Sequence, residues 1–212
     1  MGAMVNVVII PASPALVAAL APADAASEQV RTKAQECIAG ALKESPKRPI
    51  EFVGSYSASW HTEHTGSFRA WGAQQTRVSE GNFLPELVAR YLIENSAALE
   101  DYRECSFAST RDKLAEINAS SLTIVAVDGS AGLTPKAPLA LVEGSDEIDQ
   151  WCREVLRGES PPARSEEQLS QGGIVEPGIW LELASIRPQS ALLIEADTSL
   201  GVGRYIACWE VS

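Results

Sequence analysis

The sequence predicts a single α/β domain, a three-layer αβα sandwich on a central, mostly parallel or mixed sheet. Three observations lead to this fold class. The chain opens with a β-branched run at 5–10, which is typical of a strand buried on both faces and hence central in its sheet. A helical pattern at 27–43 and a second apolar run at 50–54 follow, so this part of the chain predicts a βαβ unit. Apolar runs and helical patterns then alternate to the end of the chain.

Each later element has its own local signal. The segment 82–99 carries apolar residues at helical spacing, and 145–157 has an acidic first turn and late arginines, as the helix dipole favours. The helical pattern at 166–184 is interrupted by glycines and a proline. The remaining expected elements are a strand at 103–107, a short helix at 110–118, a buried strand at 122–127, and two closing strands at 191–195 and 204–211 joined by a turn at Gly201-Val202-Gly203.

Composition excludes some classes of partner. The chain has 212 residues, 45% of them hydrophobic, which is enough to bury the core of one domain at 4–212; Met1-Gly2-Ala3 is expected to be an expression scar. The net charge of −11 argues against nucleic acid or an anionic membrane as the main partner, because phosphate binding needs clustered Lys and Arg. No apolar run has the length of a membrane span. Homo-oligomerisation is compatible with the fold class.

The cysteines give a second indication of setting. The chain has four, and they are far apart in the sequence with no Cys-x-x-Cys or Cys/His metal spacing. Most lie in apolar stretches, so free thiols and a reducing, cytoplasmic location are expected.

A long aromatic loop at 55–75 is a candidate functional segment, because it follows a strand and has no period of its own. Its His61 and His64 are three residues apart, but without a helical period they are more simply explained as ordinary loop histidines than as metal ligands. Its aromatic residues are expected to cover the sheet edge rather than to line a pocket; they include Trp60, Phe68 and Trp71.

A second candidate segment follows the strand at 122–127. Asp128 and Ser130 stand where a buried strand meets the surface, which is the usual place for ligands in open α/β sheets. They are expected to hydrogen-bond a polar ligand, with Lys136 supplying positive charge, although a turn that satisfies the backbone explains the same residues equally well. Ser13 is expected to cap the next turn, since no Gly-x-Ser-x-Gly surrounds it.

The order of three short motifs resembles a known family. Pro11-Ala12-Ser13-Pro14-Ala15-Leu16 resembles the Pro-His-Pro-Pro-Leu-Leu segment of actinobacterial proteins related to the class III extradiol ring-cleavage dioxygenases. Val127-Asp128-Gly129-Ser130 with Lys136-Ala137-Pro138 resembles their Gly-Asp-Gly-Ser…Lys-Ala-Pro segment. The closing stretch, Gly201-Val202-Gly203-Arg204-Tyr205-Ile206-Ala207-Cys208-Trp209, is similar to their terminal motif.

The resemblance implies an αβα sandwich but not the family's chemistry. True members hold Fe(II) through two histidines and a glutamate, and use a further histidine as acid and base. The first ligand falls at Ala12 and the acid/base histidine at Ala131, and neither alanine can serve. His61 or His64 stands in the loop of the second ligand, and Glu195 lies near the right end of the chain for the third. The resemblance therefore implies a lost iron site and no cofactor, with iron or another divalent metal as the alternative.

These observations predict a catalytically silent relative that binds a small polar or aromatic ligand in a residual cleft. The cleft is expected to be walled by Ala12-Ser13, the loop 61–71 and the segment 128–136. Two alternatives remain open at this point. One is a metal-dependent oxygenase or hydrolase with a remodelled site in the same cleft, and the other is a protein-interaction domain in which the cleft is vestigial.

Overall fold

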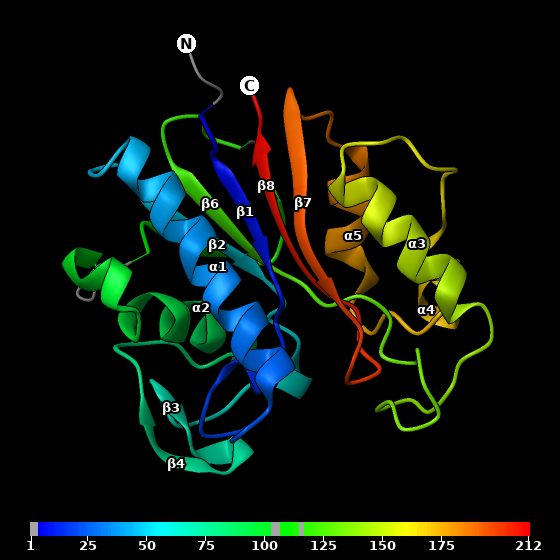
Figure 1. The fold of residues 1–212 in the computed structure, drawn as a ribbon, viewed down its shortest axis with the longest axis horizontal. Helices are drawn as coiled ribbons and strands as arrows, with labels where there is room; N and C mark the ends of the chain where they lie inside the picture. The colour runs from blue at the N-terminus through cyan, green and yellow to red at the C-terminus, as the bar shows by residue number, and fades with distance from the viewer. Residues whose placement is uncertain (1–3, 103–106, 115–116) are drawn as a thin grey trace.

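The computed structural model describes residues 4–102, 107–114 and 117–212. In this part of the chain six strands form one sheet in the order β5-β2-β6-β1-β8-β7 (Figure 1). The first four in this order are parallel to one another, whereas β8 is antiparallel to both β1 and β7. The strands are β1 (Val7–Ile10), β2 (Ile50–Gly54), β5 (Ser109–Arg111), β6 (Leu122–Ala126), β7 (Ser190–Asp197) and β8 (Arg204–Glu210).

Helices cover both faces of this sheet. α1 (Ala25–Glu44) and α2 (Leu84–Glu94) lie on one face, and the other carries α3 (Ser145–Leu156), α4 (Glu166–Gln171) and α5 (Pro177–Ser185) (Figure 1). A small hairpin of β3 (Ser67–Phe68) and β4 (Ala73–Arg77) lies beside α2. This is the expected three-layer αβα sandwich on a mixed sheet. No described helix is long and apolar enough to cross a membrane.

The apolar pattern of the strands explains why both faces are covered. All four residues of β1 are fully buried, and they alternate between the two layers of the core. Val8 and Ile10 pack toward α1 and α2, whereas Val7 and Ile9 pack toward α3 and α5. β1 is therefore an interior strand, as its composition predicted.

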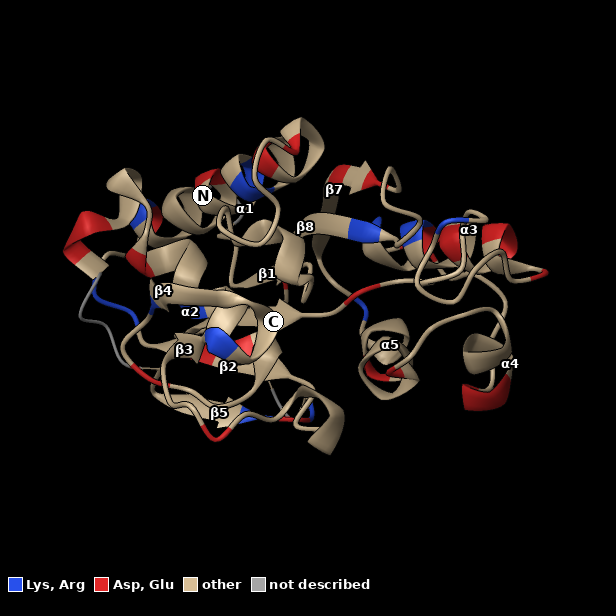
Figure 2. Ribbon diagram, turned by 90° about the horizontal axis from the view of Figure 1, so that it is seen from below, with Lys and Arg blue, Asp and Glu red and all other residues tan. Residues whose placement is uncertain are grey.

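The helix termini follow the expected electrostatics. Acidic residues open both α3 and α4, where they complement the positive end of the helix dipole (Figure 2). Ser165 and Gln168 form a capping box at the start of α4. The helical pattern at 166–184 is broken between α4 and α5, as the glycines and proline there predicted.

Two expected elements differ in the structure. Thr110 and Arg111 belong to strand β5, so the helix expected at 110–118 is wrong at its start. Backbone pairing with β2 decides this conformation, because β5 adds a parallel edge strand opposite Glu51–Val53. The strand expected at 103–107 falls mostly outside the described residues. The helix expected at 82–99 ends at Glu94, and a 3₁₀ helix follows at Ala97–Tyr102.

Candidate ligand-binding pocket

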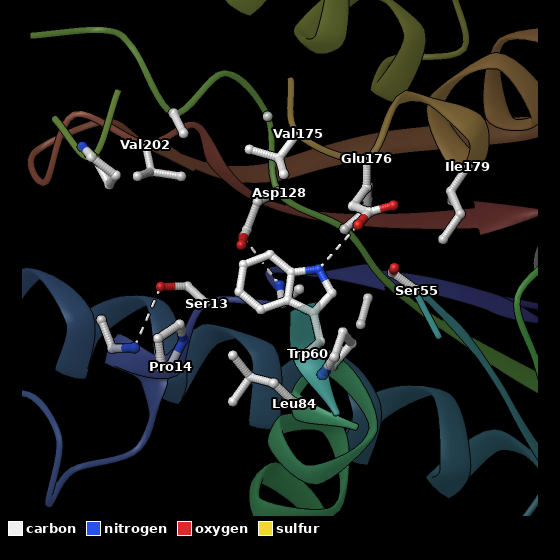
Figure 3. Close-up of a pocket in the computed structure, with 18 of the residues that line it drawn as sticks. Ser13, Pro14, Ser55, Trp60, Leu84, Asp128, Val175, Glu176, Ile179 and Val202 are labelled. Carbon is white, nitrogen blue, oxygen red and sulfur yellow. Dashed lines mark hydrogen bonds between the residues drawn. The ribbon is translucent and has the colours of Figure 1, made fainter. Parts of the chain in front are cut away.

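A cavity of about 500 Å³ opens at the carboxyl ends of β1 and β6 (Figure 3). The 3₁₀ helices at Pro14–Leu16 and Ala58–Trp60, the first turns of α2 and α5, and the loop between β7 and β8 complete its walls. This is the usual location of ligand sites in open α/β sheets. Most of the lining is apolar, and its members are Ala12, Ser13, Pro14, Ala15, Ser55, Trp60, Leu84, Pro85, Ala126, Val127, Asp128, Gly129, Ala131, Pro138, Leu139, Val175, Glu176, Ile179, Leu200 and Val202.

Asp128 places a carboxyl group in these apolar surroundings. Its Oδ1 accepts a hydrogen bond from the backbone N–H of Ala12 at 3.1 Å, and Figure 3 shows the carboxyl directed into the pocket. Burial raises the pKa of Asp128 to about 7. The N–H groups of Ala12 and Ser13 and the charge of Arg204 act in the opposite direction on this pKa. Near neutral pH the group therefore exists in both protonation states, so it can accept a hydrogen bond or exchange a proton with a ligand.

The backbone around Asp128 is fixed from three sides. Trp180 Nε1 donates to the carbonyl oxygen of Asp128 at 2.7 Å, and the N–H of Gly129 donates to the carbonyl of Gly203 at 2.7 Å. A Cβ atom on Gly129 would lie 2.6 Å from Tyr205 Oη, so only glycine allows this close approach. The backbone that carries the carboxyl is thus held by α5 and by the entry to β8.

Trp60 and Glu176 form a second polar pair in the wall. The indole Nε1 of Trp60 donates to Glu176 Oε1 at 3.2 Å, and Figure 3 shows the ring lying across the pocket. Trp60 lies in the aromatic loop, and Glu176 directly precedes α5. The prediction that the loop aromatics only cover the sheet edge is therefore wrong for Trp60. It holds for Phe68, which is fully buried in the core.

Glu176 carried no recognisable signal in the sequence. The only local indication was the proline that follows it, which starts a helix and so places residue 176 at a helix entry. Its position opposite the aromatic loop depends on how α5 packs on the sheet.

The two other candidate polar residues of the segment 128–136, Ser130 and Lys136, do not join Asp128 in the pocket. Ser130 is fully buried, and its Oγ accepts a hydrogen bond from the N–H of Gly132 at 3.2 Å. Its side chain therefore stabilises a turn of the backbone, which is the alternative to ligand binding that the sequence left open. Lys136 is exposed and lies outside the lining. Ser13 lines the pocket, but its Oγ accepts from the N–H of Ala15 and caps the following 3₁₀ helix, as predicted.

The candidate metal ligands do not meet. His61 and His64 are exposed and outside the pocket lining, and the His61 ring lies 5.0 Å from that of Phe83, centroid to centroid. Glu195 lies on β7, where its Oε2 accepts from Gln29 Nε2 of α1 at 3.1 Å. Within residues 4–102, 107–114 and 117–212 no three His, Cys, Asp or Glu side chains are grouped so as to hold a metal ion. The described residues thus do not fit the two-histidine, one-carboxylate site that the family resemblance implies.

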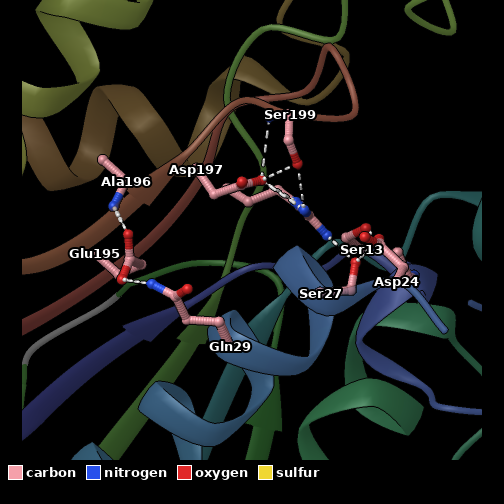
Figure 4. A network of polar contacts seen from close by, with 10 residues as sticks. Ser13, Asp24, Ser27, Gln29, Glu195, Ala196, Asp197 and Ser199 are labelled. Carbon is pink, nitrogen blue, oxygen red and sulfur yellow. Dashed lines mark hydrogen bonds and ion pairs between the residues drawn. The ribbon is translucent and has the colours of Figure 1, made fainter.

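A buried arginine connects the strands behind the pocket to α1. Arg204 Nε donates to Asp197 Oδ2 at 2.9 Å, and Arg204 Nη1 donates to Ser27 Oγ at 2.5 Å. Ser27 Oγ in turn donates to Asp24 Oδ2 at the start of α1 (Figure 4). Ser27 lies in the first turn of α1, which begins at Ala25, and its hydroxyl links Arg204 to Asp24.

No protein-family model matches the chain, and no curated protein matches it.

Proposed function

We propose that this protein binds a small, largely apolar molecule whose polar group, an amine in preference to a hydroxyl, is held by Asp128. The observation that carries the proposal is the carboxyl of Asp128, which accepts a hydrogen bond from the N–H of Ala12 and is directed into a mostly apolar cavity of about 500 Å³. Cavities of this volume, with a few fixed polar groups among apolar walls, are typical of small-molecule sites.

The charge of the pocket favours a hydrogen-bond donor or a cation as the polar group. The two ionisable side chains in its lining are Asp128 and Glu176, both carboxyl groups. No described side chain donates a hydrogen bond to the Asp128 carboxyl, so a ligand N–H or O–H would satisfy it. A carboxylate or phosphate ligand would meet like charge in an apolar site, which is unfavourable.

The size and walls favour an aromatic or compact aliphatic body. The Trp60 ring forms one wall, and aromatic ligands stack against such a face. Leu84 and Ile179 supply aliphatic contacts. This combination supports the expectation of a small polar or aromatic ligand.

The placement of two alanines supports a relationship to extradiol dioxygenases. Ala12 and Ala131 stand where the resemblance puts a metal ligand and the acid/base histidine, and both line this same pocket. This arrangement fits a cleft that is derived from the family's active site, still binds a small molecule, and lacks the side chains that would hold a metal. The relationship remains part of the proposal.

Three probes that share one ring test the proposal: benzylamine, benzyl alcohol and benzoate. Thermal unfolding of the full chain is measured with each, because a ligand at one hundred times its Kd stabilises the folded state by about 2.7 kcal/mol. We expect stabilisation to be largest with benzylamine, smaller with benzyl alcohol and absent with benzoate. The preference should disappear in Asp128→Asn and persist in Asp101→Asn, which changes an exposed carboxylate outside the pocket lining.

Equal effects of the three probes, or retention of the amine preference in Asp128→Asn, would overturn the proposal. Metal content of freshly purified, untagged protein is measured in parallel. Near-stoichiometric iron, manganese or zinc that is lost in His61→Ala or His64→Ala would instead support the metal-dependent alternative.

A further inference from the structure

Three exposed apolar side chains lie at the mouth of the pocket. Among the described residues six large hydrophobic side chains are exposed, and three of them line this cavity. They are Leu139, Val175 and Leu200, with exposed fractions of 49%, 52% and 41%. A side chain that lines a cavity and is still about half exposed lies at the opening of that cavity. The pocket therefore has an apolar rim, formed by these three residues, which continues its apolar walls outward.

Backbone hydrogen bonds hold the rim in place. The N–H of Leu139 donates to the carbonyl of Ala131 at 3.0 Å, and the N–H of Ala131 donates to the carbonyl of Gly173 at 2.8 Å. The N–H of Leu133 donates to the carbonyl of Gly201 at 3.0 Å. Gly173 and Gly201 each lie one or two positions from another rim residue. The three segments that carry the rim are thus bonded to one another, so the rim is a fixed part of the pocket.

The cavity is large for the aromatic probes named above. Its volume of about 500 Å³ lies in the range that encloses drug-sized ligands, roughly 300–1,000 Å³, and benzylamine is much smaller than such ligands. Single exposed hydrophobic residues are normal on a protein surface, whereas a group of them at a cavity is typical of a ligand-binding groove. A ligand held by Asp128 can therefore fill the cavity and extend its apolar part across the rim.

We propose that the ligand is a primary amine with a long aliphatic chain, whose ammonium group binds Asp128 and whose chain crosses the rim. The inference rests on the proposed amine site and adds the length and kind of the ligand's apolar part. The rim residues are all aliphatic, and burial of a chain against them removes CH2 groups from water. Because the rim is continuous with the cavity, one molecule that occupies both is favoured over a separate protein partner on the rim alone.

A series of alkylamines of increasing length tests the proposal. Calorimetric titration of the full chain is carried out with butylamine, hexylamine, octylamine, decylamine and dodecylamine, each below the concentration at which it forms micelles. We expect the affinity to rise about fourfold for each CH2 group that becomes buried, and to keep rising through decylamine. Asp128→Asn should weaken the binding of every member of the series, because all of them share the ammonium group.

Variants of the rim show where the chain lies. Leu139→Asn combined with Leu200→Asn should weaken decylamine binding about fivefold and leave butylamine binding unchanged, because only the longer chain reaches the rim. The matched control combines Met4→Asn with Leu192→Asn, which replaces two exposed hydrophobic residues outside the pocket lining. It should leave both affinities unchanged. All four side chains are exposed, so both double variants are expected to fold.

Failure of this inference can be distinguished from failure of the proposed function. If butylamine and benzylamine do not bind, or bind equally well to Asp128→Asn, the amine site itself is wrong and the chain assignment is overturned with it. If these short amines bind through Asp128 but the affinity stops rising at hexylamine, only the chain assignment is overturned. A rim variant that binds decylamine as the wild type does would also overturn it, and would mean that the rim serves another contact, such as one with a protein.

Discussion

The backbone N–H of Ala12 donates a hydrogen bond to the carboxyl of Asp128, which lies 116 positions further along the chain. The contact joins the ends of two adjacent parallel strands, β1 and β6. It holds one oxygen of a partly buried carboxyl that is directed into the pocket. The position of this carboxyl therefore depends on the pairing of β1 with β6.

Asp128→Asn should change stability in a pH-dependent way. The folded protein binds the Asp128 proton more tightly than the unfolded chain, because the pKa rises from 3.8 to about 7 on burial. The wild type therefore loses stability relative to the variant as pH rises from about 4 to about 7. At pH 8 the variant should be more stable by on the order of 2 kcal/mol, allowing for the partial exposure of Asp128, and near pH 3 the difference should vanish. Urea unfolding at both pH values checks this, and a difference that does not change with pH would contradict it.

Benzylamine affinity should rise with pH through the same titration. At a pKa of about 7 the ionised fraction of Asp128 grows about tenfold between pH 6 and pH 8, while the amine stays protonated. Calorimetric titration should show a similar gain in affinity for the wild type and none for Asp128→Asn. An affinity that falls over this range would mean that the protonated carboxyl is the binding form.

Arg204→Met should be strongly destabilising. Arg204 is fully buried, and its removal leaves Asp197 and Ser27 without their main partner, at a cost of about 3–5 kcal/mol in the free energy of unfolding. Loss of its charge should also raise the pKa of Asp128, since Arg204 lowers it in the wild type. Urea unfolding and carboxyl NMR titration measure the two effects. The matched control is Arg187→Met, because Arg187 is exposed and donates only to backbone carbonyls.

Gly129→Ala should destabilise the strand end that carries Asp128. The added Cβ would lie 2.6 Å from Tyr205 Oη, and Tyr205 cannot yield easily because it donates a hydrogen bond to Asp149. We expect a loss of about 1–3 kcal/mol. Gly40→Ala is the control in α1, where the new methyl group meets nothing within 4 Å; it should stabilise by about 0.5–1 kcal/mol. Similar effects of the two substitutions on thermal unfolding would refute the packing argument.

The sequence by itself determined the αβα architecture and the strands of its centre. β1, β2 and β6 are short, mostly apolar runs, and such runs can be buried only between two layers of helices. The same local logic predicted α3 and the position of Asp128 at a strand end. These features follow from burial and turn chemistry within a few neighbouring residues, which a single sequence records.

Only the tertiary structure decided which side chains meet. Trp60 and Glu176 are 116 positions apart, and their hydrogen bond depends on how α5 packs beside the aromatic loop. The same packing leaves His61 outside the pocket. Strand register likewise sends Cys208 to the face covered by α1, where it packs against the same core cluster as Cys37. Contacts of this kind arise from the relative placement of whole elements, which the periodicity within one element does not specify.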